Sequence, residues 1–256
     1  MPGVTTLFDQ ISNAVTTHHV QDGTSAALPS ALLSARAGAT VCMAPSRNAG
    51  MGDFLLVSGA TTEFFNFRTL DSEAGPAMNA SRALHAYTTL NDGRVMFIGG
   101  LDATAAVTTS CEIYDPVADT FTTVAPLPGP RAGHAAATMP DGRVLVTWNY
   151  IADDKANDGY YERALLYTIS RDSGVSWSEQ KLIGPLADSK HLGAVRHNVL
   201  PWSKDRWLLP LRVGPPRIYD PRTGATYIYK IAAQRSAPQR STAQHSHPIR
   251  PYWRKN

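Results

Sequence analysis

Short apolar runs alternate with turn residues along most of this chain, and this pattern predicts strands instead of helices. The clearest example is the stretch from residue 82 to residue 128. Its apolar, small-residue and Thr-rich runs predict four strands, at 85–90, 95–98, 108–114 and 120–124. Asp92-Gly93 separates the first two runs and is typical of a hairpin turn, because glycine accepts the positive φ that tight turns need.

An aromatic residue recurs at a nearly constant spacing. The four positions are Phe65, Tyr114, Tyr167 and Tyr219, at spacings of 49, 53 and 52 residues. The string EIYDP around Tyr114 closely matches the string RIYDP around Tyr219. A repeat of this length with four short strands per unit is the pattern of a propeller blade.

Two further landmarks recur in the same order. An arginine precedes the first predicted strand of three successive units, as Arg36, Arg82 and Arg131, at spacings of 46 and 49. The Asp-Gly pair of the hairpin recurs as Asp141-Gly142, 49 residues after Asp92-Gly93. Three landmarks in one order at one period are improbable by chance, so we expect successive copies of one structural unit.

The stretch from 82 to 128 resembles a kelch repeat. It has the glycine pair Gly99-Gly100 after its second predicted strand, the string YDP at 114–116, and Phe121 where kelch repeats usually have tryptophan. The resemblance is good for this unit, partial for its two neighbours and weak for the last unit. It implies an all-β fold, a small kelch-like β-propeller of four blades, or alternatively five, each made of four antiparallel strands.

The resemblance also divides the chain into three parts. The propeller would take residues 34–230, preceded by an N-terminal arm or closing strand at 1–33 and followed by a basic, extended tail at 231–256. The segment 11–20 alternates weakly between apolar and polar residues. It would either close the last blade or help to form a fifth, irregular one.

The segment 170–177 resembles an Asp-box, the S-x-D-x-G-x-x-W hairpin of sialidase-like propellers. The matching residues are Ser170, Asp172, Gly174 and Trp177. We expect structural roles, in which the aspartate binds backbone amides, the glycine takes the strained turn position and the indole packs beneath the hairpin. The motif indicates a hairpin and says little about chemistry.

Charge is distributed unevenly along the chain. The formal net charge is +3, but residues 231–256 carry five basic and no acidic side chains, which leaves 19 basic and 21 acidic ones, or −2, in the other 230 residues. The body is therefore not a basic platform, and we expect no nucleic-acid partner. We also expect no membrane span and no signal peptide, because the apolar runs are too short. The expected location is the cytoplasm, or a virion into which the chain is assembled.

Cysteine and histidine give no metal or redox signature. Cys42 and Cys111 are the only cysteines and form no CxxC pattern, which argues against a disulfide framework and against a Cys-based zinc site. The clustered histidines, His18-His19 and His245 with His247, lack carboxylates at ligand spacing. We therefore expect no metal and no cofactor.

The repeated arginines Arg36, Arg82 and Arg131 are the candidate ligand-binding residues. In kelch-like propellers the first strand of each blade lines the central channel, so these side chains would ring one mouth of it. Guanidinium groups there would bind carboxylate or phosphate by bidentate hydrogen bonds, which suits an acidic ligand. The alternative is that each arginine binds neighbouring loop carbonyls and holds the blades together.

An acidic insertion raises a second class of function. Its acidic and tyrosine residues are Asp153, Asp154, Asp158, Tyr160, Tyr161 and Glu162. This composition suits a glycan ligand, and a glycoside hydrolase would need two carboxylates, or a tyrosine with a partner, across the scissile bond. An acidic loop is more often solvated than catalytic, so we assign no catalytic residue. A glycan-binding or sialidase-like propeller is the alternative to a non-enzymatic one.

The C-terminal tail is the candidate partner-binding segment. Arg250, Tyr252, Trp253 and Arg254 are of the residue types that are enriched at interface hot spots. The rest of the tail is rich in Gln, Ser, Ala and Pro, which is typical of segments that do not fold alone. We therefore expect it to dock on other protein subunits, which makes the chain a structural or adhesion module of a multi-chain assembly. Virion and phage tail proteins offer the analogy.

Overall fold

The computed structural model describes residues 4–8, 15–19, 24–27, 32–34, 39–44, 53–66, 69, 71–151, 163–183, 200–203, 206–209, 217–223 and 225–228, and the structural statements below concern these residues. The chain divides into two compact units. The first consists of residues 1–146 and 168–180, and the second of residues 147–167 and 181–256. None of the described segments is a helix of the length and apolarity needed to cross a membrane.

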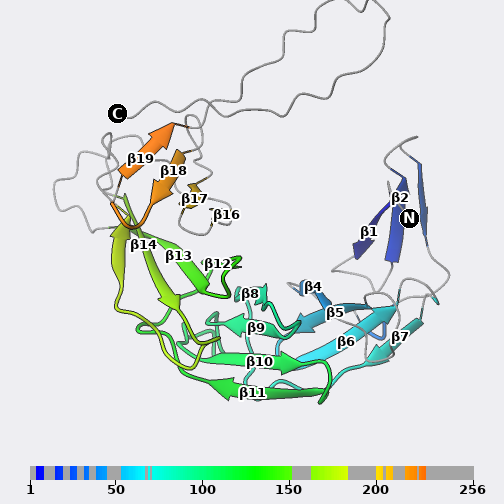
Figure 1. Ribbon diagram of the computed structural model, residues 1–256. Coiled ribbons are helices and arrows are strands. Elements are labelled where there is room, and N and C mark those ends of the chain that lie inside the picture. The colour runs from blue at the N-terminus through cyan, green and yellow to red at the C-terminus, as the bar shows by residue number, and fades with distance from the viewer. Residues whose placement is uncertain are drawn as a thin grey trace, which may run out of the picture. The chain divides into compact units, whose positions relative to one another are not determined.

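The described residues form small sheets of consecutive strands (Figure 1). A three-stranded sheet comes first, in which β1 (Val4–Phe8) and β3 (Ser25–Ala27) are both antiparallel to β2 (Val15–His19). Two four-stranded antiparallel sheets follow. Their strands are β4 (Thr40–Ala44), β5 (Asp53–Ser58), β6 (Thr61–Asn66) and β7 (Asp71–Ala74), and then β8 (Ala86–Thr89), β9 (Val95–Ile98), β10 (Cys111–Asp115) and β11 (Thr120–Val124).

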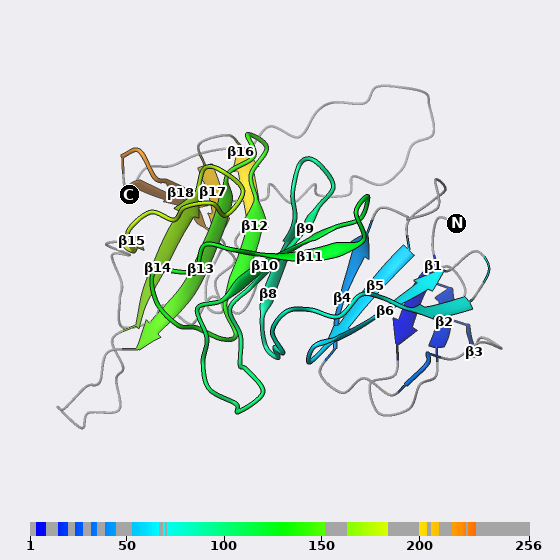
Figure 2. The same ribbon diagram turned by 90° about the horizontal axis from the view of Figure 1, so that it is seen from below.

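Two more four-stranded sheets follow in the described residues (Figure 2). The first contains β12 (Ala135–Thr138), β13 (Val144–Ile151), β14 (Arg163–Ser170) and β15 (Lys181–Ile183). The second is antiparallel and contains β16 (Leu200–Ser203), β17 (Arg206–Leu209), β18 (Arg217–Asp220) and β19 (Ala225–Ile228). All four such sheets share one connectivity, in which each strand pairs with the next one along the chain.

The aromatic repeat of the sequence falls on one strand position. Phe65, Tyr114, Tyr167 and Tyr219 lie on β6, β10, β14 and β18, which are the third strands of the four sheets, and all four side chains are buried. The period in the sequence is therefore the period of one four-stranded sheet.

The strands expected at 95–98 and 120–124 are confirmed as β9 and β11. The strand expected at 108–114 is shorter, because β10 begins at Cys111. The Thr108 amide donates to the Gly100 carbonyl, and the Ser110 carbonyl accepts hydrogen bonds from the Gly99 amide and from Arg82. A loop and an arginine side chain thus take up the backbone groups just before β10.

Strand β2 lies inside the segment 11–20, for which two roles were considered. In the described residues β2 pairs with β1 and β3, within a sheet of its own. Val15 of β2 packs into a cluster with Leu32, Leu56 and Phe65. Phe65, the repeated aromatic residue of β6, therefore packs partly against residues that precede the sheet β4–β7 in the chain.

A larger core lies between the sheets β4–β7 and β8–β11. The ring centroids of Phe64 and Tyr114 are 5.8 Å apart, and Phe121 lies 5.1 Å from Tyr114 and 5.8 Å from Phe97. These separations are typical of favourable aromatic pairs. The first strands are also neighbours, since β8 lies beside both β4 and β12, and the Thr88 and Thr138 hydroxyls are hydrogen-bonded at 2.9 Å.

The two Asp-Gly turns have the same geometry. Gly93 and Gly142 have φ values of +89° and +86°, which glycine adopts without strain. In the first turn the Asp92 carboxylate accepts hydrogen bonds from the amide and the guanidinium group of Arg94, and the turn at 141–143 repeats these contacts. The arginine that follows each turn is therefore part of the repeated hairpin.

The second unit has an aromatic cluster of its own. Tyr167 lies 4.9 Å from Trp207 and 6.4 Å from Tyr219, and Trp207 lies 5.4 Å from Tyr219, measured between ring centroids. Trp207 is fully buried. Tyr219 is also buried, and this burial is the main cause that raises its pKa to about 12. The repeated tyrosines thus pack against one another in this unit.

Candidate functional site

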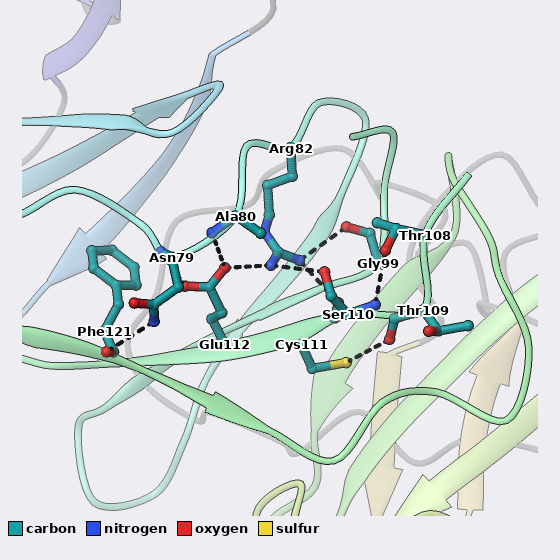
Figure 3. Close-up of polar contacts among 10 residues, drawn as sticks. All are labelled: Asn79, Ala80, Arg82, Gly99, Thr108, Thr109, Ser110, Cys111, Glu112 and Phe121. Carbon is teal, nitrogen blue, oxygen red and sulfur yellow. Dashed lines mark hydrogen bonds and ion pairs between the residues drawn. The ribbon is translucent and has the colours of Figure 1, made fainter. Parts of the chain in front are cut away.

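Arg82 is the centre of a buried polar network (Figure 3). It lies in the loop between β7 and β8, and Nη2 binds the Glu112 carboxylate of β10 at 2.6 Å, with both side chains at most 1% exposed. Nη1 donates to the carbonyl oxygens of Gly99 at 3.1 Å and of Ser110 at 2.9 Å. A charged pair so far from water needs hydrogen bonds to its other polar atoms. The two carbonyls and the Ser110 hydroxyl supply them to the Arg82 Nη atoms, whereas Nε has no hydrogen-bond partner among the described residues.

Glu112 also holds the loop that leads into Arg82. Its carboxylate accepts hydrogen bonds from the amides of Asn79 at 2.7 Å and Ala80 at 3.0 Å. The Asn79 side chain in turn donates to the Phe121 carbonyl of β11 at 3.1 Å (Figure 3). One carboxylate on a third strand thus fixes both the loop backbone and the arginine.

The first repeat has the same carboxylate position. Glu63 of β6, 49 residues before Glu112, is fully buried and accepts a hydrogen bond from the Leu33 amide at 2.6 Å. Leu33 precedes Asn79 by 46 residues, which is the spacing of the first two repeated arginines. A buried glutamate that holds the loop before its sheet is therefore common to the first two repeats.

The third repeat differs at this position. Glu112 stands two residues before the repeated tyrosine, and the aligned residue two positions before Tyr167 is Leu165. Arg131 is buried, its Nε donates to the Gly129 carbonyl at 3.0 Å, and burial lowers its pKa to about 10. The same arginine position thus has different surroundings in successive repeats.

The glycine pair after β9 lets the backbone pass close to both arginine loops. Gly99 and Gly100 have φ values of +56° and +104°. A Cβ on Gly99 would lie 2.7 Å from the Arg131 carbonyl oxygen, and one on Gly100 would lie 2.4 Å from the Ala83 carbonyl oxygen. The Gly100 amide donates to the Arg131 carbonyl at 2.8 Å. Glycine is thus required at both positions of the kelch-like pair, because a Cβ would clash with the neighbouring backbone and because both residues have a positive φ.

Two histidines occupy equivalent positions beside this pair. His85 and His134 stand three residues after Arg82 and Arg131 and directly precede β8 and β12. Both side chains are buried, and none of their four ring nitrogens has a hydrogen-bond partner of ordinary geometry among the described residues. Burial lowers the pKa of each histidine to about 4, and the charges of Arg82 and Arg131, respectively, lower it further.

The Asp-box segment forms a tightly bonded turn after β14. The Ser170 hydroxyl accepts a hydrogen bond from the Gly174 amide at 2.7 Å, and Asp172 accepts one from the Ser176 amide at 2.9 Å. Gly174 has a φ of +87°, and Trp177 Nε1 donates to the Ala125 carbonyl at 3.0 Å. Ala125 directly follows β11, so the indole attaches this turn to the preceding sheet.

The structure brings two of the three predicted anion-binding residues to the glycine pair. The contacts of Arg82 agree with the alternative hypothesis, in which the arginine binds loop carbonyls. No part of its side chain is exposed. Arg131 is also buried. Arg36 lies outside the described residues, so the three-arginine site stays a prediction.

Other predicted residues also lie outside the described part of the chain. These are the acidic insertion at 152–162 and the tail residues Arg250, Tyr252, Trp253 and Arg254. Cys42 and Cys111 are buried free thiols, and burial raises the pKa of Cys42 to about 12 and that of Cys111 to about 11. The residues that are described contain no group of three or more His, Cys, Asp or Glu side chains arranged to hold a metal ion.

Comparison with known proteins assigns no family to this arrangement: no protein-family model matches the chain, and no curated protein is significantly similar to it.

Sequence reasoning missed the partners of the arginine. Glu112 stands in the repeated string EIYDP, whereas Glu63, His85 and His134 belong to none of the motifs described above. Their common 49-residue spacing was the available signal. This spacing could not show that the four polar side chains are buried. They stand in or beside strands, and the exposure of a side chain there depends on how the neighbouring sheet packs.

Proposed function

We propose that this chain is a kelch-like, four-bladed β-propeller that serves as a non-enzymatic structural or adhesion module in a multi-chain assembly. The observation that carries the proposal is the buried pair of Arg82 and Glu112. A ligand site would expose the repeated arginine to solvent. Arg82 is instead buried, and it ties the loop between two sheets to β10, the third strand of its sheet. The second repeat therefore uses its repeated arginine for rigidity.

The propeller part rests on the four sheets of equal connectivity and on their first strands. In a propeller the first strands of the blades line the axis, and here β8 lies beside both β4 and β12. Closing the ring would also cover the edge strands that an open array leaves free to aggregate. A variant of residues 1–230 should then have a radius of gyration of about 17 Å by X-ray scattering, as expected for a compact domain of that length. A value above about 20 Å would contradict closure.

The assembly part rests on the composition of residues 231–256. The tail's Tyr252 and Trp253 are flanked by Arg250 and Arg254, and burial of two aromatic side chains in a partner's groove would offset the entropy lost on ordering an extended segment. The propeller body would then present the module, and the tail would attach it. An assembly of the virion or phage tail type needs chains of this kind.

The test is site-specific photocrosslinking in the cells that produce the assembly. A photoreactive residue replaces Trp253 in one variant and Val117 in the control, because Val117 is 96% exposed on the turn between β10 and β11. We expect the Trp253 variant to form a crosslink to one defined protein subunit and the Val117 variant to form none. Equal labelling of both variants, or none from position 253, would refute docking through the tail. Selective retention of the unmodified chain on a glycan array would favour the carbohydrate-binding alternative.

A further inference from the structure

His85 and His134 have no part in the proposed assembly role, yet their environment is unusual. Each residue is more than nine-tenths buried, and no ring nitrogen of either has a hydrogen-bond partner of ordinary geometry among the residues that the structure describes. Buried polar atoms are normally paired, so two such rings at equivalent positions of successive repeats call for an explanation.

Both rings are held tightly in place. A Cβ on Gly99 would lie 2.9 Å from His134 Cε1, and one on Gly100 would lie 3.0 Å from the His85 Cβ. The ring centroid of His85 is also 5.6 Å from that of Phe97 on β9, in an edge-on arrangement. The backbone of the glycine pair thus packs against both histidines, and Phe97 of β9 packs against His85 as well.

The charges around the pair favour the neutral form. The Arg82 charge acts on His85, and the charges of Arg131 and His85 act on His134. The backbone groups of Arg82 and Ile98 oppose this, but less strongly than burial does. Cys111 stays protonated, because burial raises its pKa to about 11, and the nearby carboxylate, Glu112, already binds Arg82.

We propose that His85 and His134 form an acid-sensitive latch, in which protonation of the two buried rings beside Arg82 and Arg131 separates the starts of β8 and β12. A protonated ring needs solvent or a carboxylate. Burial keeps solvent from both rings unless the two strands move away from the glycine pair. The latch is independent of the tail and of the closure of the ring.

The sign of the pH dependence follows from the direction of the two pKa shifts. Each histidine has a folded-state pKa of about 4, below its ordinary value of 6.5, so the unfolded chain takes up protons first as the pH falls. Stability is therefore full above pH about 6.5 and falls as the pH approaches 4. The unfolding equilibrium constant should rise roughly 10³-fold between pH 7.5 and pH 5, with about 30-fold from each histidine.

The experiment measures denaturant unfolding of the full chain at pH 7.5 and at pH 5. It compares the wild type with His85→Gln, His134→Gln and the double variant, and His18→Gln serves as the control from a strand of another sheet. We expect the rise in the unfolding equilibrium constant from pH 7.5 to pH 5 to be about 30-fold smaller in each single variant than in the wild type. The double variant should lose nearly all of the rise that the two histidines cause. The control should show the same rise as the wild type. A double variant with the pH dependence of the wild type would overturn the latch.

A second measurement needs no substitution and so remains decisive if a variant fails to fold. Hydrogen–deuterium exchange at the imidazole C2 position, read by mass spectrometry, gives the pKa of each histidine in the folded wild type. We expect values well below 6.5 for His85 and His134, together with faster amide exchange at 86–89 and 135–138 at pH 5 after correction for intrinsic rates. An ordinary pKa for either ring would overturn the proposal. So would a Zn²⁺-dependent rise in Tm that the double variant lacks, because the rings would then be metal ligands.

Discussion

The second and third repeats use the same arginine position in different ways. In the second, Arg82 meets Glu112 at 2.6 Å, and both are cut off from water. In the third, the residue aligned with Glu112 is Leu165, and Arg131 binds the Gly129 carbonyl of its own loop. A period in the sequence thus fixes where a residue stands in the fold. The residue opposite, on the third strand, decides what the side chain does.

The comparison also shows what a buried pair requires. Arg82 without Glu112 would be a buried, uncompensated charge, and the amides of Asn79 and Ala80 would lose their acceptor. The third repeat has no carboxylate at that position, and burial correspondingly lowers the pKa of Arg131 to about 10. The stability of the second repeat should therefore depend strongly on the Glu112 carboxylate, whereas the third repeat has no carboxylate at this position on which to depend.

The largest effect should come from removing that carboxylate. We expect Glu112→Ala to lower the free energy of unfolding by about 3–5 kcal/mol, because it leaves the Arg82 charge buried and alone. Chemical denaturation measures the loss. The control is Arg94→Ala, which breaks the exposed pair with Asp92 and should lose at most about 1 kcal/mol. Similar losses in the two variants would show that burial adds nothing to the pair.

The glycine pair gives the next largest effect. Gly100→Ala places a Cβ 2.4 Å from the Ala83 carbonyl oxygen at a φ of +104°, so we expect a loss of about 3 kcal/mol or more in unfolding free energy. Gly133→Ala is the matched control, since its φ is +63° but a Cβ there meets nothing within 4 Å. That variant should lose only about 1 kcal/mol, from backbone strain alone. A Gly100→Ala variant no less stable than Gly133→Ala would contradict close packing of the loops.

A smaller effect should follow at the Asp-box turn. Trp177→Phe keeps an aromatic ring but removes the hydrogen bond to the Ala125 carbonyl, so we expect a loss of about 1 kcal/mol in thermal or denaturant unfolding. Val175→Ala changes the same turn at a side chain that is largely exposed and should change stability by less than about 0.5 kcal/mol. If the two substitutions have equal effects, the indole does not attach the turn to the preceding sheet.

The smallest effect concerns Leu84, which aligns with Gly133. Its φ of +50° is uncommon for leucine, and its side chain is largely exposed. Leu84→Gly relieves the strain but adds freedom to the unfolded chain, so the free energy of unfolding should change by less than about 1 kcal/mol. A loss of about 2 kcal/mol or more by denaturant titration, which is roughly the cost of exposing a buried apolar side chain, would show that this leucine packs in the fold.

Local signals predicted much of the fold. The apolar runs at 95–98 and 120–124 are β9 and β11, and the Asp-Gly pairs form the expected turns, because turn chemistry and strand pattern are properties of neighbouring residues. The start of β10 could not be predicted, since Arg82 and the glycine pair use the backbone of residues 108–110.

The candidate site was harder to predict than the strands. The repeat located Arg82 correctly in the loop before a first strand, but its partner is 30 residues away on β10. Periodicity cannot tell whether a glutamate in an antiparallel strand faces water or a neighbouring loop, because burial is decided by the packing of sheets. The same limit applies to His85 and His134, whose buried state follows from how closely the glycine pair approaches.

The central claim is that the repeated arginine serves the fold, and a double-mutant cycle tests it most directly. Unfolding free energies are measured for the wild type, Arg82→Met, Glu112→Leu and the double variant, each with and without inorganic phosphate. We predict that each single variant is strongly destabilised, that the double variant is less destabilised than either single variant, so that the coupling energy exceeds the loss in either one, and that phosphate changes all four alike. A stable Arg82→Met variant with negligible coupling, together with phosphate stabilisation of the wild type alone, would instead assign Arg82 to an anion-binding site.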